Sequence, residues 1–158
     1  MIFAPAAAAL FRREAFIRVG LFDERYFMYH EDVDLGWRLW IAGHRIITAP
    51  KAVAYHHFGG TTKESKGMAW RELIGERNNI RALLKNYSFG KSLKAVRDLA
   101  LLPQPGRRKL GQIRNLLWNL VFYPETYMYR RRIQRKRVRS DGDLERLIVQ
   151  SKDVLVRI

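Results

Sequence analysis

Three carboxylic acids, Glu31, Asp32 and Asp34, stand within four positions of a segment that is rich in aromatic residues. Carboxylates among bulky apolar groups often have a perturbed proton affinity, which a base that accepts a proton from a reacting hydroxyl requires. The spacing also allows a simpler interpretation, in which Glu31 and Asp34 cap a helix and Asp34 pairs with Arg38 four residues later. We therefore treat residues 22–38 as a candidate for acid–base chemistry and keep the capping interpretation beside it.

Two adjacent histidines, His56 and His57, follow Tyr55 at the end of a predicted strand and precede a glycine-rich loop. An imidazole there can ligate a metal ion, although a surface histidine beside an aromatic ring explains the pattern more simply. Mg²⁺ or Mn²⁺ would also need carboxylate ligands, and Asp141 and Asp143 sit in a basic segment where a helix start explains them better. The chain has no cysteine, which excludes thiolate metal sites and disulfides.

The elements that would position these residues are predicted to be mixed α/β in the first part of the chain. Apolar and β-branched runs predict short strands at residues 6–12, 45–48 and 52–57. Residues 13–19 and 31–42 predict two helices, because each ends at a glycine and the second begins with acidic residues. The second helix has apolar residues around most of its circumference, so we expect it to be largely buried.

The rest of the chain is predicted to be helical. The expected helices cover residues 63–86, 89–102, 110–123 and 126–139, with Pro124 as an interruption and a last short helix from Asp141 to residue 155. These patterns divide the chain into a mixed α/β part at 1–62, a helical extension at 63–104 and a basic amphipathic helical tail at 105–158.

The formal net charge of +15 is concentrated in this tail. Residues 1–60 hold seven basic and six acidic side chains, whereas residues 107–158 hold fourteen basic and five acidic ones. Basic side chains around an apolar, aromatic stripe are typical of a helix that lies on an anionic membrane surface. A solvated basic helix that pairs with neighbouring domains is the alternative. A nucleic-acid-binding module would explain the tail but not the acidic first part, so we expect no nucleic-acid partner.

A set of short motifs occurs in a fixed order along the chain. The set comprises Arg12-Arg13-Glu14-Ala15-Phe16, Val19-Gly20-Leu21-Phe22-Asp23-Glu24, Phe27-Met28-Tyr29, Glu31-Asp32-Val33-Asp34-Leu35 with Arg38, Ala42-Gly43-His44-Arg45, Pro50 and Tyr55-His56-His57-Phe58-Gly59-Gly60-Thr61. It closely resembles the carboxyl-terminal half of family 2 (GT-A type) glycosyltransferases, in the bacterial rhamnosyltransferase-like branch that builds cell-surface polysaccharide. Residues 76–78 and 83–87 look like the helical segment that follows, so the resemblance covers about residues 6–88.

The resemblance implies an inverting transfer of a sugar, such as rhamnose, from a nucleotide-diphosphate donor to an acceptor hydroxyl on a lipid-linked glycan. In that family an aspartate on the acceptor side removes the acceptor proton, which implies Asp32 as the base, with Glu31 and Asp34 as supporting carboxylates. Arg38 and Arg77 are the substrate contacts that the resemblance suggests, although a solvated helix position is the simpler interpretation for Arg77. A hydroxyl is a poor nucleophile until a positioned base takes its proton, so this assignment makes chemical sense.

The resemblance also implies partners that this sequence does not supply. A histidine binds the divalent cation, Mg²⁺ or Mn²⁺, in several relatives, which points to His56 first and His57 second. The main carboxylate ligands belong to a nucleotide-binding half with an Asp-x-Asp motif, which we expect on a preceding segment or a separate polypeptide. The chain alone is therefore expected to be inactive, in a cytoplasmic setting on the inner face of the plasma membrane. A non-catalytic remnant or an assembly partner of a complete transferase is the alternative.

Overall fold

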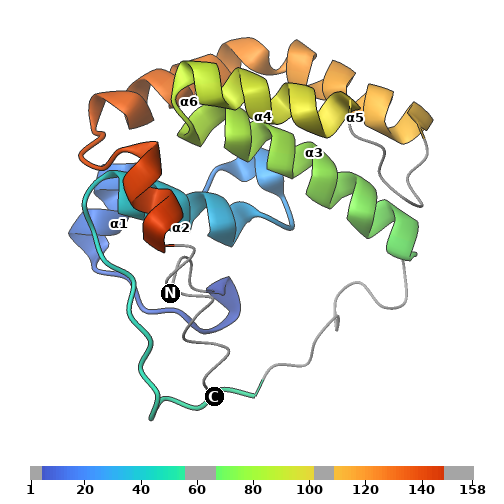
Figure 1. Cartoon of the computed structure of the whole chain (residues 1–158). Helices are drawn as coiled ribbons and strands as arrows, with labels where there is room; N and C mark the ends of the chain where they lie inside the picture. Colours follow the sequence, from blue (N-terminus) through green and yellow to red (C-terminus); the bar gives the residue numbers. More distant parts are fainter. Residues whose placement is uncertain (1–4, 56–66, 102–108, 148–158) are drawn as a thin grey trace.

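The structure, a computed structural model, describes residues 5–55, 67–101 and 109–147. Its elements are η1 (Ala6–Ala8), α1 (Arg13–Val19), η2 (Glu24–Tyr26), α2 (Glu31–Ile41), α3 (Met68–Asn86), α4 (Phe89–Leu101), α5 (Lys109–Val121) and α6 (Tyr123–Arg135). A further helical stretch covers residues 141–147. Helix α3 lies in the middle, with α4, α5 and α6 packed on one side and α2 on the other (Figure 1). Within the described ranges, no helix is both long and apolar enough to cross a membrane.

The predicted α/β fold is wrong, because the described residues are helical or irregular and contain no strand. The first predicted strand begins as the 3₁₀ turn η1, and residues 44–49 and 52–55 form no ladder. A strand needs a neighbour to receive its backbone hydrogen bonds, and side chains that prefer strands cannot supply one. Ile47 and Val53, which suggested strands by their type, are instead 80% and 76% exposed.

The helices were predicted more successfully, because their ends carry local signals. Helices α1 and α2 occupy the expected segments, and both Gly20 and Gly43 adopt the left-handed conformation that ends them, with φ of 90° and 89°. Pro124 was expected to interrupt a helix, but it lies in the first turn of α6, where a missing N–H costs no hydrogen bond. Both predicted domain boundaries, at 62/63 and 104/105, lie outside the described residues.

Helix α2 is buried on two sides, as its apolar circumference predicted. On one side Leu35 and Leu39 pack with Ala15 and Val19 of α1. On the other side its residues Trp40 and Ile41 form a second cluster with side chains of α6 and of the last helical stretch, namely Ile133 and Leu144. The basic tail therefore contributes to the core that holds the acidic helix in place.

Arginines of the tail also complete the carboxyl-terminal ends of helices α2 and α3. Arg139 donates to three carbonyls in the last turn of α2 and just after it, those of Trp40, Gly43 and His44, at 3.0, 3.1 and 2.7 Å. At the end of α3, Arg130 donates to the carbonyl of Leu84 at 2.5 Å, and Arg137 donates to that of Asn86. The last carbonyls of a helix lack partners within the helix and carry a partial negative charge, so cations stabilise them.

Candidate active site

The loop that leads into α2 is held in an unusual backbone conformation. Phe27, Tyr29 and His30 all have positive φ, at 58°, 64° and 68°. Phe27 is the centre of a three-residue turn closed by the Met28 N–H, which donates to the Tyr26 carbonyl at 2.5 Å. A left-handed conformation costs a residue with a side chain roughly 1–2 kcal/mol, so the surrounding structure must hold this loop in place.

The side chain that holds it is Asn78 of α3. Asn78 is fully buried, and its Nδ2 lies 3.0 Å from the Tyr26 carbonyl and 2.8 Å from each of the carbonyls of Met28 and Tyr29. The two hydrogens of the amide are therefore shared among three acceptors. Arg77 fixes the other end of the amide, because its Nε and Nη2 donate to Asn78 Oδ1 at 3.0 and 2.9 Å. Nothing in the local sequence marked Asn78 for this role, since the loop lies about fifty residues earlier.

The clamped loop delivers Glu31 and Asp32 to the first turn of α2, where both are half-buried. Asp32 Oδ1 accepts from the Val33 N–H at 2.8 Å. Burial raises the pKa of the Glu31 carboxyl, and the charge of Asp32 adds to this increase. Glu31 Oε2 is buried without a partner among the described residues. The amino end of a helix favours negative charge, so this turn can hold a carboxylate ready to accept a proton.

His30 belongs to the same turn, although the sequence had not marked it as a site residue. Its Nδ1 is buried with no hydrogen-bond partner among the described residues, and its ring packs against α3 close to Gly75. Burial lowers the pKa of the imidazole, against the opposing charge of Asp32, so the ring is uncharged at neutral pH. His30 and Glu31 thus present two incompletely bonded polar groups beside Asp32.

Asp34 lies elsewhere, inside a network of buried charges. It is fully buried, and it accepts from Arg38 Nε at 2.9 Å, Lys85 Nζ at 3.0 Å and Asn86 Nδ2 at 2.8 Å. Burial alone would raise its pKa, but Lys85 and Arg38 lower it to about 2. These contacts give Asp34 a structural role, and its predicted role beside the base stays a prediction. The pairing of Asp34 with Arg38, which was one part of the simpler interpretation, is present in the structure.

The same network fixes the start of the loop. Asp23 accepts from Arg81 Nε at 3.0 Å and from Lys85 Nζ at 2.6 Å, and it caps η2 by accepting from the Arg25 N–H at 3.1 Å. Burial opposes the ionised form of Asp23, but the charges of Lys85 and Arg81 outweigh it and lower its pKa. Two carboxylates of the acidic segment are thus tied to cations of α3, which sets the position of the turn between them.

The two arginines that were predicted to bind substrate are both engaged within the protein. The Arg77 guanidinium lies 4.3 Å from the centre of the Trp118 ring, and burial lowers its pKa. Arg38 is 2% exposed, and its Nη1 donates to the Val19 carbonyl at 2.7 Å. Its Nη2 has no partner among the described residues.

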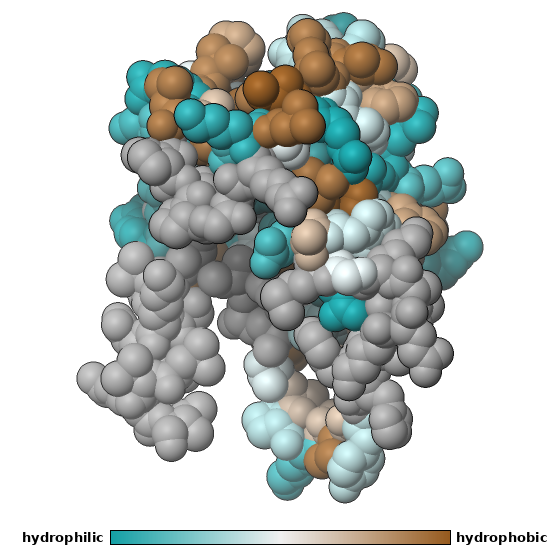
Figure 2. Space-filling model, turned by 90° about the vertical axis from the view of Figure 1, so that its right-hand side faces the viewer, coloured by the Kyte–Doolittle hydropathy of each residue, from teal (hydrophilic) through white to brown (hydrophobic). Residues whose placement is uncertain are grey.

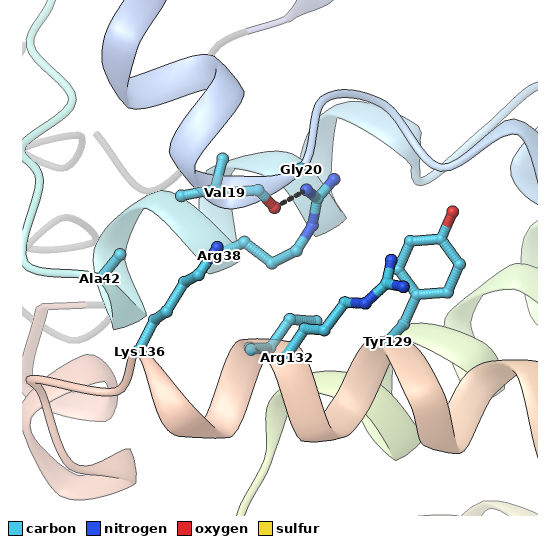
Figure 3. A pocket seen from close by; sticks show the side chains of 8 residues that line it. Val19, Gly20, Arg38, Ala42, Tyr129, Arg132 and Lys136 are labelled. Atoms are coloured by element: carbon cyan, nitrogen blue, oxygen red, sulfur yellow. Dashed lines mark hydrogen bonds between the residues drawn. The ribbon is translucent and has the colours of Figure 1, made fainter.

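Arg38 nevertheless lines a small cavity of about 110 Å³ between α1, α2 and α6 (Figure 3). The cationic side chains of its wall are Arg38, Arg132 and Lys136, beside the ring of Tyr129 and the turn at Gly20. Lys136 Nζ donates to the Arg18 carbonyl at 2.5 Å, and the side chain of Arg132 is exposed. The cavity is therefore the place where Arg38 could contact an anion.

The predicted metal ligands His56 and His57 lie outside the described residues. In the parts of the chain that the structure describes, no three His, Asp or Glu side chains come together as a metal site would require. Asp143 and Ser140 form a reciprocal helix cap, as the sequence suggested: Asp143 Oδ2 accepts from the Ser140 N–H at 2.8 Å, and Ser140 Oγ accepts from the Asp143 N–H at 3.1 Å. The described residues thus do not build the expected divalent-cation site.

Comparisons with known proteins link part of this chain to rhamnosyltransferases. It is 57% identical over 53 residues to the N-acetylglucosaminyl-diphospho-decaprenol L-rhamnosyltransferase of two Mycobacterium tuberculosis strains, a match that covers 34% of this chain and 17% of that protein. It is 43% identical over 63 residues to the rhamnosyltransferase WbbL of Escherichia coli, covering 39% of this chain and 24% of that protein. The matches therefore span less than a quarter of either relative. No family model and no solved structure matches the chain. The similarity supports a rhamnosyltransferase-like glycosyltransferase role.

Proposed function

We propose that this chain is the acceptor-side part of an inverting glycosyltransferase, which transfers a sugar such as rhamnose from a nucleotide-diphosphate donor to a hydroxyl of a lipid-linked glycan. The observation that carries the proposal is the loop held by Asn78, which presents Asp32 and Glu31 at the half-buried amino end of α2. Strained backbone that the surrounding fold maintains is typical of functional sites. Similarity to two rhamnosyltransferases supports the type of reaction.

In this proposal Asp32 is the general base. As the acceptor oxygen attacks the anomeric carbon of the donor sugar, its proton moves to the Asp32 carboxylate, and the nucleoside diphosphate leaves from the opposite side of that carbon. Glu31, whose pKa is raised, and the uncharged His30 are placed to hydrogen-bond the acceptor and hold its hydroxyl toward Asp32. Asp34 takes no proton, because it is buried among three donors and remains ionised down to acidic pH.

Donor binding is assigned to a nucleotide-binding segment or polypeptide that acts together with this chain. A divalent cation at the donor diphosphate is part of the same proposal, and the described residues do not supply its site. On the acceptor side, the cavity beside Arg38, with Arg132 and Lys136 on its wall, suits a phosphate group of the lipid-linked acceptor. The proposal therefore separates the base, at the amino end of α2, from a cationic pocket near its carboxyl end.

The test uses cells in which the gene for this chain has been deleted and restored. Membranes from these cells are supplied with a labelled nucleotide-diphosphate sugar and an N-acetylglucosaminyl-diphospho-polyprenol acceptor, and the labelled lipid product is measured. We expect the wild-type chain to restore transfer and Asp32→Asn to lower its rate by about 100-fold or more, the contribution of a general base. Glu24→Gln, which removes an exposed carboxylate in η2, is the matched control and should leave the rate unchanged.

The outcomes separate the proposal from its alternative. If Asp32→Asn restores transfer as well as the wild-type chain does, the chain contributes no base, and an assembly role in a complete transferase explains it instead. If the wild-type chain does not affect transfer at all, the glycosyltransferase proposal itself is wrong.

A further inference from the structure

Helix α5 has its polar and apolar faces reversed relative to the rest of the protein. Its buried side chains are Asn115 and Asn119, which are 1% and 3% exposed. Its exposed side chains include five large apolar ones, Leu110, Ile113, Leu117, Leu120 and Val121, which are 53–79% exposed. A helix that packs on a soluble core normally places its apolar face inward. An exposed apolar face of this size therefore indicates that α5 contacts a second apolar environment outside this core.

Hydrogen bonds to α3 fix this orientation. Asn115 Nδ2 donates to the Leu73 carbonyl at 3.0 Å and to Glu76 Oε2 at 3.1 Å, and Asn119 Nδ2 donates to the Arg77 carbonyl at 3.0 Å. Buried amides that lost these partners would be costly to the fold, so α5 cannot easily turn its apolar side inward. The exposed stripe is therefore a stable feature of the surface.

The stripe is continuous and bordered by positive charge. Ile113, Leu117 and Leu120 follow one another at spacings of four and three, which places them on one side of the helix. At 100° per residue, Lys109 and Arg114 fall on the two edges of this side, and both are exposed. Basic side chains on both edges of an apolar stripe are the pattern of a helix lying in a bilayer interface.

Helix α4 extends the same kind of surface. Its exposed residues Phe89, Leu93 and Leu101 are interspersed with the exposed cations Lys94 and Arg97. Figure 2 shows hydrophobic residues gathered along the upper part of the molecule, at the height of α4 and α5 in Figure 1, with hydrophilic residues between them. Single exposed apolar residues are common on soluble proteins, but several large ones on each of two helices are not.

We propose that the exposed apolar stripe of α5, together with the exposed apolar residues of α4, docks the protein on the surface of an anionic phospholipid bilayer. A bilayer suits the stripe better than another protein does, because the charged side chains of α5 itself, Lys109 and Arg114, are both basic and both exposed beside the stripe. Anionic headgroups complement these charges, and each Lys or Arg near such a surface strengthens binding about fivefold. The inference does not depend on the proposed transferase activity.

The first experiment measures co-sedimentation of the full chain with phosphatidylcholine vesicles that contain or lack phosphatidylglycerol. We expect binding to the anionic vesicles only, and a loss of binding as the salt concentration rises. Leu117→Glu should weaken binding about tenfold or more, because it removes a large apolar contact and adds a negative charge. Ile47→Glu is the matched control: it makes the same charge change at an exposed apolar residue away from α5 and should bind nearly as well as the wild-type chain.

A second experiment uses the absence of native cysteines. An environment-sensitive fluorophore on Leu117→Cys should shift to the blue on anionic vesicles and be quenched by nitroxide-labelled lipids, whereas the same fluorophore on Ile47→Cys should not. Circular dichroism checks that each variant keeps its helical content.

Several results would overturn the inference. These are equal binding to neutral and anionic vesicles, undiminished binding of the Leu117→Glu variant, or no quenching at position 117. A concentration-dependent dimer that Leu117→Glu dissociates, with no vesicle binding, would assign the stripe to self-association instead.

Discussion

Replacement of Asn78 by alanine tests the structural basis of the site directly. The substitution removes the amide that holds the carbonyls of Tyr26, Met28 and Tyr29 and takes away the contact that each of them makes with α3. Two N–H groups share the three contacts, so they are worth about two buried hydrogen bonds, or ~2 kcal/mol. The loop should then relax from its left-handed conformations, because the contacts that compensated for their cost are gone.

Hydrogen exchange measures this effect where it occurs. The Met28 N–H closes the turn on the Tyr26 carbonyl, and the Asp34 N–H bonds the His30 carbonyl at 2.9 Å, so both amides report on the loop. A local loss of ~2 kcal/mol corresponds to exchange about 30-fold faster at these two positions. Urea unfolding of the same variant should show a global loss of similar size.

Asn79→Ala is the matched control for this prediction. It makes the same change one position further along α3, at a side chain that makes none of the three contacts of Asn78. The gain in helix propensity is therefore the same in both variants. Asn78→Asp should be worse than Asn78→Ala, since it places a carboxylate against the three carbonyls. If Asn78→Ala loses no more stability than Asn79→Ala and leaves the exchange rates of the Met28 and Asp34 amides unchanged, Asn78 does not hold the loop.

Two further predictions concern stability. The pKa of Asp34 is lowered to about 2, so its ionised form stabilises the fold at pH values above the unfolded-state pKa of about 3.9, and a contribution of ~2 kcal/mol is lost as the pH falls through this window toward 2. Urea unfolding between pH 6 and pH 2 checks this, and a wild-type profile no steeper than that of Asp34→Asn would contradict it. Gly20→Ala should destabilise the fold by ~1 kcal/mol, because φ is 90° there although no atom lies within 4 Å of the added Cβ. Gly90→Ala in α4, with equally open space and no positive φ, should stabilise it by a similar amount, and thermal unfolding that gives both the same sign would exclude the backbone explanation.

The parts of the fold that the sequence predicted well are those with local causes. Helix α2 begins at acidic residues and ends before Gly43, and both signals lie within the helix or next to it. The predicted strands failed for the opposite reason, since Ile47 and Val53 favour extended backbone but a strand depends on a partner elsewhere in the molecule. Pro124 was recognised as a helix boundary, yet its position in the first turn of α6 required knowing where that helix starts.

The candidate site shows the same division. Spacing alone suggested that Asp34 pairs with Arg38, and it does, but the contacts of Asp34 with Lys85 and Asn86 join residues about fifty positions apart. The role of Asn78 has no local signature either, because a buried asparagine in a helix resembles any other until its acceptors are known. The sequence therefore identified the acidic turn. Only the three-dimensional contacts distinguished the half-buried Glu31 and Asp32 from Asp34, which is fully buried among cations.

The contacts also show that part of the positive charge of the tail is used inside the protein. Arg130, Arg137 and Arg139 look like part of a basic surface in the sequence, yet each donates to backbone carbonyls at the end of α2 or α3. Arginines that donate to helix ends are less available to bind an anion outside the protein. The net charge of the tail therefore overstates how strongly it attracts such an anion. Lys109 and Arg114 on α5, by contrast, are exposed beside the apolar stripe. If the proposed docking occurs, removing these two should weaken binding to anionic vesicles more than removing Arg139, whose loss should instead destabilise the end of α2.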